Sequence, residues 1–395
     1  MTTIHYPLAT SSWDEREYAA IQRVTASGRL TMGDEVAAFE RAFAAHVGAE
    51  HAIMVNSGSS ANLLMVAALC YHSTHRLRPG DEVLVPAVSW STTYTPPAQY
   101  ALPLRFVDID PHTLNIDIAS LEDAITDRTR LLLAVNLLGN PNDFAALKPL
   151  LDRHDILLIE DNCESLGAAL HGRQAGTFGL AGSYSCFFSH HISTMEGGLV
   201  VTDDAELHHI MLSLRAHGWT RDLPHHNHVT GTKSTDPFTE SFRFVLPGYN
   251  LRPLEIAGAI GREQLRKLPA IIRARRANAR IFREVMAHHP DLRIQRETGA
   301  SSWFGFSLII HPDSSLTRPA LIKALTRAGI EYRPIVAGNF TRNPVVANHI
   351  PHTIHGPLTH ADHLDRNGLF IGNHHYPLEQ QMDRLDSALT SLTGS

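Results

Sequence analysis

The sequence is poor in cysteine and in lysine, and each scarcity excludes a kind of chemistry. Among its 395 residues the cysteines are Cys70, Cys163 and Cys186. Three thiols make no disulfide framework, and they cannot supply the four thiolates of an ordinary iron–sulfur cluster. An enzyme that holds an aldehyde as a Schiff base needs a lysine for it, and this chain offers few lysines for that role. The lysines are Lys148, Lys233, Lys267 and Lys323.

Long apolar runs and an excess of positive charge are also missing. The strongly apolar stretch at 131–139 is far too short to cross a bilayer. The first 17 residues lack the basic start and apolar run of a signal peptide. A net charge of −6 gives no indication of a surface for nucleic acid. We therefore expect a cytoplasmic globular protein with neither a membrane nor a nucleic acid as partner.

Histidine, by contrast, is abundant, and it gathers in short clusters. Pairs stand at 208–209 and 374–375, and a third group lies within 225–228. None of them is accompanied by a C-x-x-C or H-E-x-x-H motif. We interpret these clusters as surface or loop histidines, and we expect no metal site.

Apolar, β-rich runs alternate with helical segments through the first half of the chain. Helices are expected at about 13–25 and 33–46, and 52–69 reads as a strand, a glycine–serine turn and a helix. Further strands are expected at 82–89, 104–110, 130–139, 156–161 and 184–188. Nearly continuous apolar strands between helices predict an α/β fold with a mostly parallel sheet covered on both faces.

Beyond about residue 250 the pattern changes. A long helical region covers 254–289, in which Pro269 is expected to mark a break or a new first turn. Strands are expected at 301–310 and 330–335, with an amphipathic helix at 315–330 between them. The sequence therefore predicts a large cofactor-binding α/β domain at 1–250 and a smaller α+β domain at 251–395.

Two strand ends carry groups suited to binding an anion and a cation. In VNSGSSANLL (55–64) a strand ends at Asn56, Gly58 permits an unusual turn, and a helix is expected to begin near Ser60. Such a helix start can bind phosphate, although a serine-rich N-cap is equally common without a ligand. In LLIEDNCESLGA (157–168) a strand ends on Glu160 and Asp161. Their partner could be a protonated pyridine nitrogen, or they could simply cap a helix.

Three further motifs are ambiguous when taken alone. Trp90 in VPAVSWSTTY could stack on a planar cofactor or belong to the core. The loop that opens PGYNLRPLEIAGAIGREQL (247–265) could meet a phosphate or cap its helix. In SCFFSHHISTMEGG (185–198), His190 and His191 stand between an aromatic strand and a glycine turn, where α/β enzymes tend to place reactive groups.

Taken in order, these motifs resemble the DegT/DnrJ/EryC1/StrS sugar aminotransferase family of fold-type-I pyridoxal phosphate enzymes. The resemblance runs from about residue 10 to the C-terminus and implies an aspartate aminotransferase-like fold. In that family the segment before GEGG reads S-F-x-x-x-K, and its lysine forms the Schiff base. Here that slot falls on His190, and no lysine lies in the motifs. The resemblance therefore implies pyridoxal or pyridoxamine 5′-phosphate held without a covalent bond.

Histidine in the lysine slot implies dehydration in place of amino transfer. Imidazole cannot form the Schiff base, but it can take a proton and return it to a departing hydroxyl. Family members with this exchange are sugar 3-dehydratases, and some of them use an iron–sulfur cluster. Because cysteines are few, the resemblance is to those without a cluster, which act on GDP-4-keto-6-deoxy-D-mannose on the way to colitose, a sugar of lipopolysaccharide O-antigens. It implies GDP-4-keto-3,6-dideoxymannose as product and L-glutamate as the donor that regenerates pyridoxamine phosphate.

The resemblance also assigns roles to single residues. It makes His190 the catalytic acid and base and leaves His191 structural. Cofactor-binding roles fall on Gly58, Ser59, Trp90, Asp161, Glu164, Ser185 and Asn250. Asn250 is implied to come from the partner subunit, which predicts a homodimer with shared active sites. Loops that resemble the sugar-nucleotide pocket contain His217, Arg221, Phe242, Glu331 and Arg333.

Two other functions stay open at this level. A nucleotide-sugar 4-aminotransferase would share nearly all of these motifs, but it needs the lysine. A non-catalytic relic that only binds the cofactor would also have lost the lysine. The presence of Asp161, Trp90, Ser185 and Asn250 argues against such decay.

Overall fold

The computed structural model describes residues 3–393, and its largest element is an eight-stranded sheet. The strand order is β1-β9-β8-β5-β4-β2-β3-β15. Six neighbouring strands from β8 to β15 run parallel, and β9 is antiparallel to both β1 and β8. The fold is therefore α/β with a mostly parallel sheet, as the sequence predicted. The bounds are β1 His51–Val55, β2 Glu82–Pro86, β3 Leu104–Val107, β4 Thr129–Val135, β5 Leu157–Asp161, β8 Ala181–Ser185, β9 Gly198–Thr202 and β15 His352–Ile354.

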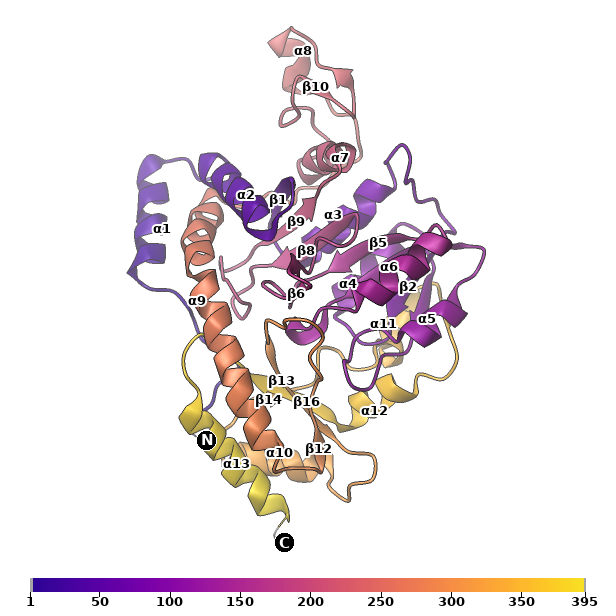
Figure 1. Cartoon of the computed structure of the whole chain (residues 1–395). Coiled ribbons are helices and arrows are strands. Elements are labelled where there is room, and N and C mark those ends of the chain that lie inside the picture. The colour runs from indigo at the N-terminus through magenta and orange to yellow at the C-terminus, as the bar shows by residue number, and fades with distance from the viewer. Residues whose placement is uncertain (1–2, 394–395) are drawn as a thin grey trace.

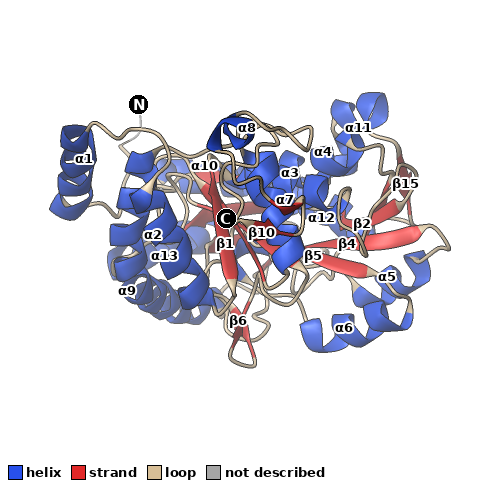
Figure 2. Ribbon diagram, turned by 90° about the horizontal axis from the view of Figure 1, so that it is seen from above, coloured by secondary structure: helices blue, strands red, loops and turns tan. Residues whose placement is uncertain are grey.

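Helices cover both faces of this sheet, which is why its strands are apolar throughout. Along β4, Leu131 and Leu133 pack into one cluster while Leu132 and Ala134 pack into another on the opposite face. Figure 2 shows α5 and α6 on one side of the strands and α3 and α4 on the other. The bounds of these helices and of α7 are α3 Gly58–Leu69, α4 Ser91–Gln99, α5 Ile118–Ala124, α6 Phe144–Arg153 and α7 Ala205–Arg215.

A second, four-stranded antiparallel sheet lies at the end of the molecule that holds both termini (Figure 1). Its order is β12-β13-β16-β14, and Phe306 and Leu308 of β13 belong to its own apolar cluster. The strands are β12 Leu292–Arg293, β13 Gly305–Ile310, β14 Tyr332–Arg333 and β16 Gly368–Gly372. Helices of this half of the chain are α10 Arg318–Arg327, α11 Pro344–His349, α12 Thr359–Asn367 and α13 Glu379–Thr393.

One long helix, α9 (Glu255–Met286), connects the two sheets. Its first half packs on α1 (Glu15–Ser27) and α2 (Asp34–Val47), and its end joins the apolar cluster of the second sheet. The break expected at Pro269 is wrong: the helix runs through it for 32 residues. Pro269 is exposed, and the buried face on either side of it is continuous, so packing holds the helix together. A domain boundary at about residue 250 stays a prediction.

A segment of mixed structure projects from the body beyond α7, at the top of Figure 1. We call residues 217–248 the protruding segment; it contains β10 (His226–Asn227), β11 (Gly231–Thr232) and α8 (Pro237–Ser241). Two short strands elsewhere, β6 (Ala169–Leu170) and β7 (Arg173–Gln174), form a hairpin. Within residues 3–393, no helix has the length and apolar character needed to span a lipid bilayer.

Candidate active site

A cavity of about 510 Å³ opens at one edge of the large sheet, where several of its strands end. It is lined by residues at the carboxyl ends of β2, β4, β5 and β8 and by the first turn of α3. This is the edge at which open α/β sheets bind ligands. The sequence-predicted site residues that line it are Gly58, Ser59, Trp90, Asp161, Glu164, Ser185, His190 and Arg333.

Asp161 lies at the floor of the cavity as a buried carboxylate. Its Oδ2 accepts hydrogen bonds from Asn62 Nδ2 at 2.8 Å and from Thr93 Oγ1 at 2.7 Å, and its Oδ1 accepts one from Cys163 N at 3.2 Å. Between residues 3 and 393 no Lys, Arg or His forms an ion pair with it. A buried carboxylate that has only neutral donors still favours a nearby cation. A protonated ring nitrogen of a bound cofactor fits this position.

Glu160, the other carboxylate of the same strand, has a structural task. Its side chain is fully buried and accepts from the backbone N–H groups of Gly176 at 2.6 Å, Phe178 at 2.6 Å and Gly179 at 2.8 Å. It thereby fixes the turn that leads into β8. Since side chains alternate along a strand, Glu160 and Asp161 point to opposite faces, and only Asp161 reaches the cavity.

The start of α3 forms the anion-binding part of the cavity. The helix begins at Gly58, two residues before the expected start, because the side chain of Ser57 caps the N–H of Ser60 at 3.1 Å. In the described part of the chain, the N–H groups of Gly58 and Ser59 have no acceptor. A Cβ at Gly58 would lie 2.7 Å from Cβ of Ser185, so only glycine lets the strand end and the helix start meet. Free N–H groups at a helix start, with hydroxyls around them, suit a phosphate.

His190 lies in the loop after β8, against two phenyl rings. Its ring centroid is 5.0 Å from that of Phe304 and 6.0 Å from that of Phe187. Its buried Nδ1 has no hydrogen-bond partner within residues 3–393. Desolvation lowers the pKa of His190 to about 3, and the positive charges of Arg333 and Arg275 act in the same direction. The imidazole is therefore neutral at physiological pH and able to accept a proton.

His191 points away from the cavity into the protein. It is buried, and its Nε2 lies 3.2 Å from the carbonyl oxygen of Ser302. Burial is also the main reason that its pKa is well below the ordinary value. The pair thus divides into one residue that faces the cavity and one that anchors the loop.

The same loop is anchored again three residues after His190, by the N-terminal segment and α9. The backbone N–H of Ser193 donates to Gln264 Oε1 at 3.0 Å, and its carbonyl accepts from Trp13 Nε1 at 3.0 Å. Gln264 is itself fully buried and donates to Glu17 Oε1 at 2.8 Å. These contacts restrict the loop on the side that faces away from the cavity.

Trp90 and Glu164 complete the wall. Trp90 is the N-cap of α4 and is 58% exposed, so its ring lies at the rim and can stack on a planar ligand. Desolvation raises the pKa of Glu164 to about 7, although the charge of Arg333 opposes the shift. Glu164 Oε2 accepts from the N–H of Leu138 at 3.1 Å. Arg333, from the second sheet, places its guanidinium 4.4 Å from the ring centroid of Phe370.

Five predicted site residues do not line the cavity of the chain that carries them. Glu331 Oε2 accepts from the N–H of Leu8, and Asn250 Oδ1 accepts from Arg252 Nε. The others belong to the protruding segment or begin it, and Phe242 is 71% exposed. Their roles stay predictions. The five are His217, Arg221, Phe242, Asn250 and Glu331.

Sequence reasoning missed the two neutral residues that hold Asp161. Asn62 follows Gly58 by four positions and Thr93 follows Trp90 by three, so helical periodicity from the predicted residues could have found both. Phe304, which supports His190, comes from a distant loop, and no local pattern points to it. No group of three or more His, Cys, Asp or Glu side chains within residues 3–393 is arranged to hold a metal ion.

Residues 11–389 match the DegT/DnrJ/EryC1/StrS aminotransferase family. The chain is 58% identical over 386 residues to GDP-4-keto-6-deoxy-D-mannose 3-dehydratase of Yersinia pseudotuberculosis, with 98% of each covered.

Two solved structures of GDP-4-keto-6-deoxymannose-3-dehydratase, each 56% identical, superpose on it with a TM-score of 0.96. They cover 98% of this chain, which covers all of theirs. One is a histidine-to-asparagine variant with bound GDP-perosamine, and the other holds a trapped PLP–glutamate geminal diamine.

Proposed function

The chain belongs to the DegT/DnrJ/EryC1/StrS aminotransferase family, and from that premise we propose that it is a pyridoxal phosphate-dependent 3-dehydratase of GDP-4-keto-6-deoxy-D-mannose. The observation that carries the proposal is the neutral imidazole of His190 in a cavity without lysine. Every lysine of the chain lies elsewhere: Lys148 on α6, Lys233 in the protruding segment, Lys267 on α9 and Lys323 on α10. The cofactor is therefore held without a covalent bond to the protein.

The cavity residues fit the cofactor group by group. Gly58, Ser59 and Ser185 bind its phosphate, Trp90 stacks on its ring, and Asp161 holds the proton on its ring nitrogen. Asp161 can do so because its neutral donors, Asn62 and Thr93, leave its charge uncompensated. When bound, the cofactor supplies an amine for the 4-keto group of the sugar and a protonated ring that accepts an electron pair.

His190 moves the protons. Its neutral imidazole takes a proton from the bound complex, and the imidazolium then gives it to the departing 3-hydroxyl. Because Nδ1 is buried and unpartnered, this exchange falls to Nε2. Phe187 and Phe304 contact the imidazole and hold it in place. The lowered pKa keeps the resting imidazole unprotonated and free to accept a proton, and it makes the imidazolium, once formed, a strong acid for the second step.

We further propose a homodimer in which the partner subunit completes each cavity. Arg221, Phe242 and Asn250 do not line the cavity of their own chain, and the protruding segment extends away from the body (Figure 1). If these residues reach into the cavity of a neighbouring subunit, Asn250 would contact the cofactor phosphate there, and Arg221 and Phe242 would contact the nucleotide. His217, Glu331 and Arg333 would complete the sugar-nucleotide pocket. Glu164, near the cofactor ring, would complete the cofactor site.

The remaining elements of the proposal follow from the substrate. L-Glutamate regenerates the amine form of the cofactor, and the balance is one keto sugar and one glutamate to one 3-deoxy keto sugar, one 2-oxoglutarate and one ammonia. Such a product is a precursor of colitose in lipopolysaccharide O-antigens, and a cytoplasmic location would match a nucleotide-sugar substrate.

The test is the mass of the product. The protein is incubated with pyridoxal phosphate, L-glutamate and GDP-4-keto-6-deoxy-D-mannose, and the sugar nucleotide is analysed by mass spectrometry together with released ammonia. A product one oxygen atom lighter, with one ammonia per turnover, supports the proposal. An amino sugar that retains its 3-hydroxyl would establish the aminotransferase instead, and cofactor binding without any product would establish the relic.

A further inference from the structure

The protruding segment carries a stacked group of aromatic and basic side chains. The ring of Trp219 stacks with those of Phe242 and Phe244, with centroids 5.5 and 5.6 Å apart. The guanidinium carbon of Arg221 lies 3.8 Å from the centroid of Trp219. Phe242 and Phe244 are exposed. A flat π surface next to a guanidinium is suited to a purine base and its diphosphate.

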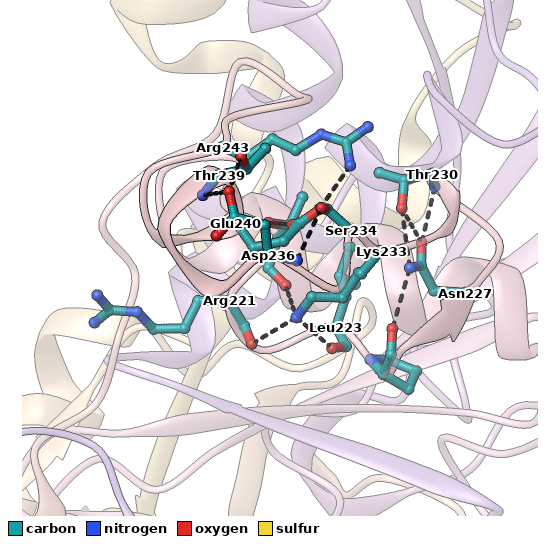
Figure 3. Close-up of polar contacts among 12 residues, drawn as sticks. Arg221, Leu223, Asn227, Thr230, Lys233, Ser234, Asp236, Thr239, Glu240 and Arg243 are labelled. Atoms are coloured by element: carbon teal, nitrogen blue, oxygen red, sulfur yellow. Dashed lines mark hydrogen bonds and ion pairs between the residues drawn. The ribbon is translucent and has the colours of Figure 1, made fainter.

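Lys233 holds the turn that carries Arg221. Its Nζ donates to the carbonyl oxygens of Thr220 at 2.9 Å, Leu223 at 3.1 Å and Arg221 at 3.3 Å. An ammonium group has three N–H donors, so all three are used on one stretch of backbone. Figure 3 shows the backbone carbonyl of Arg221 facing Lys233 while its side chain extends away from the network.

This arrangement depends on the charge of Lys233. Three carbonyl oxygens directed at one point repel one another, and a cation between them turns the repulsion into attraction. In the described part of the chain Lys233 forms no ion pair with a carboxylate, so its charge acts on the turn. The N–H of Leu223, which donates to the carbonyl of Thr220 at 3.0 Å, closes the same turn.

Glu240 fastens the turn from the other side. Its Oε2 accepts from Thr220 Oγ1 at 2.8 Å, and its Oε1 accepts from the N–H of Ser234 at 2.7 Å and from Arg243 at 2.8 Å. The N–H of Ser234 lowers the pKa of Glu240 most, and with Thr220 and Arg243 brings it to about 2. The carboxylate is thus ionised over the whole working range. Lys233 and Glu240 together tie Thr220 to the chain segment around Ser234.

We propose that Lys233 is a positioning residue that fixes the backbone of residues 220–223, so that Arg221 stays over Trp219 and meets the nucleotide part of the substrate. The inference rests on the proposed function, because it takes Arg221 as a nucleotide contact. Since the ammonium group of Lys233 is used on the backbone, we assign it no contact with the substrate or the cofactor. Its removal should therefore weaken nucleotide binding and leave the chemical steps intact.

The experiment compares K233M with the wild-type holoenzyme, using GDP as the probe. We expect the Kd for GDP, from calorimetry, and the KM for the sugar nucleotide to rise about tenfold, with kcat unchanged. Conversion of the bound cofactor by L-glutamate alone, followed by absorbance, should stay within twofold of wild type. A general structural defect would instead slow that conversion and lower kcat.

K148M is the matched control. Lys148 is also paired through its ammonium group, but with Asp152 on the exposed face of α6. This variant loses one lysine charge without touching the turn, and its Kd for GDP should equal that of wild type.

A chemical rescue restores the cation at position 233. K233C treated with 2-bromoethylamine gains an ammonium group at nearly the original length. Wild-type protein treated in parallel controls for the native cysteines, and GDP affinity should return only in the modified K233C.

The outcomes are distinguishable. Weaker GDP binding in both K233M and R221M, with recovery in alkylated K233C, supports the inference. If R221M weakens binding while K233M stays within twofold of wild type, the inference is overturned and the proposed function stands. If R221M has no effect, Arg221 is no nucleotide contact, and the inference is overturned with that assignment. Should K233M fail to fold, E240Q loosens Thr220 from the other side and gives the same readout.

Discussion

At the scale of single residues, the environment of His190 decides the chemistry. Among the residues that the structure describes, none forms an ion pair that would stabilise its imidazolium form, and two arginines disfavour that form further. Replacing His190 by Asn keeps a side chain of similar polarity but removes the group that moves protons. We expect the rate of dehydration to fall by a factor of about a hundred to ten thousand, the usual contribution of a general acid–base group. Product formation measured by mass spectrometry checks the rate, and the absorbance of bound pyridoxal phosphate checks that the site is intact.

His191→Asn is the control for this variant. His191 is buried and contacts the backbone at Ser302, so its loss should lower the melting temperature more than the turnover. Equal losses of turnover in both variants would show that the loop as a whole, not the imidazole of His190, is what the reaction needs.

Glu164 should make the stability of the cofactor-free protein depend on pH. Its pKa is raised to about 7, against about 4.3 in the unfolded chain, so the folded state binds more protons between these values. The contribution of Glu164 to the free energy of unfolding therefore falls as pH rises through this window and is constant above it. Glu164→Gln should be as stable as wild type near pH 4.5 and more stable at pH 8, by about 1 to 2 kcal/mol after allowance for solvent screening. Thermal unfolding at the two pH values measures the difference, and a variant less stable at pH 8 would contradict it.

At the scale of elements, α9 shows how tertiary packing overrides a local signal. Pro269 lacks the N–H that would donate to Leu265, and its ring crowds the preceding turn, yet the helix continues. Pro269→Ala should restore the missing hydrogen bond at an exposed position. We expect the free energy of unfolding to increase by about 1 to 3 kcal/mol, as measured by denaturant titration. A decrease would show that a bend at Pro269 is needed for α9 to follow both of its neighbours.

Some of the other elements are determined by their local sequence, and others by contacts with distant parts of the chain. Strand β4 could be predicted because both of its faces are apolar, and α3 because Ser57 and Gly58 mark its start. Strands β9 and β16 were not predicted, since their few apolar residues adjoin glycines and only pairing with distant strands defines them. The site follows the same rule. Asp161 and Ser185 could be predicted from strand ends, whereas Phe304 and Gln264 reach the loop of His190 only through the tertiary fold.

At the scale of the whole molecule, the cavity is assembled from both sheets. Strand ends of the large sheet supply Asp161 and Ser185, and the second sheet brings Arg333 to the same wall. Yet Asn250 lies outside this cavity and is exposed. A site completed by a second subunit would account for both facts. In such a dimer, the activity of a double mutant would depend on whether the two substitutions lie on the same chain or on different chains.

Mixing two inactive variants tests this dependence. One chain carries His190→Asn, and the other carries Asn250→Asp, which would place a carboxylate against the cofactor phosphate. If Asn250 acts on the partner's cavity, each mixed dimer has one cavity with both residues intact and one with neither. Random pairing makes half of the dimers mixed, so about a quarter of the wild-type activity should return. If Asn250 acts within its own chain, every cavity has one defect and nothing returns.

The control decides between restored sites and incidental gains from mixing. A chain with both substitutions, co-expressed with the His190→Asn chain, offers no intact cavity under either scheme and should stay inactive. Differently tagged chains allow the mixed dimer to be purified, and its activity per dimer should then reach about half of wild type, because one of its two cavities is complete. An inactive mixed dimer would place Asn250 with the cavity of its own chain, and the protruding segment would need another explanation for its exposed aromatic side chains.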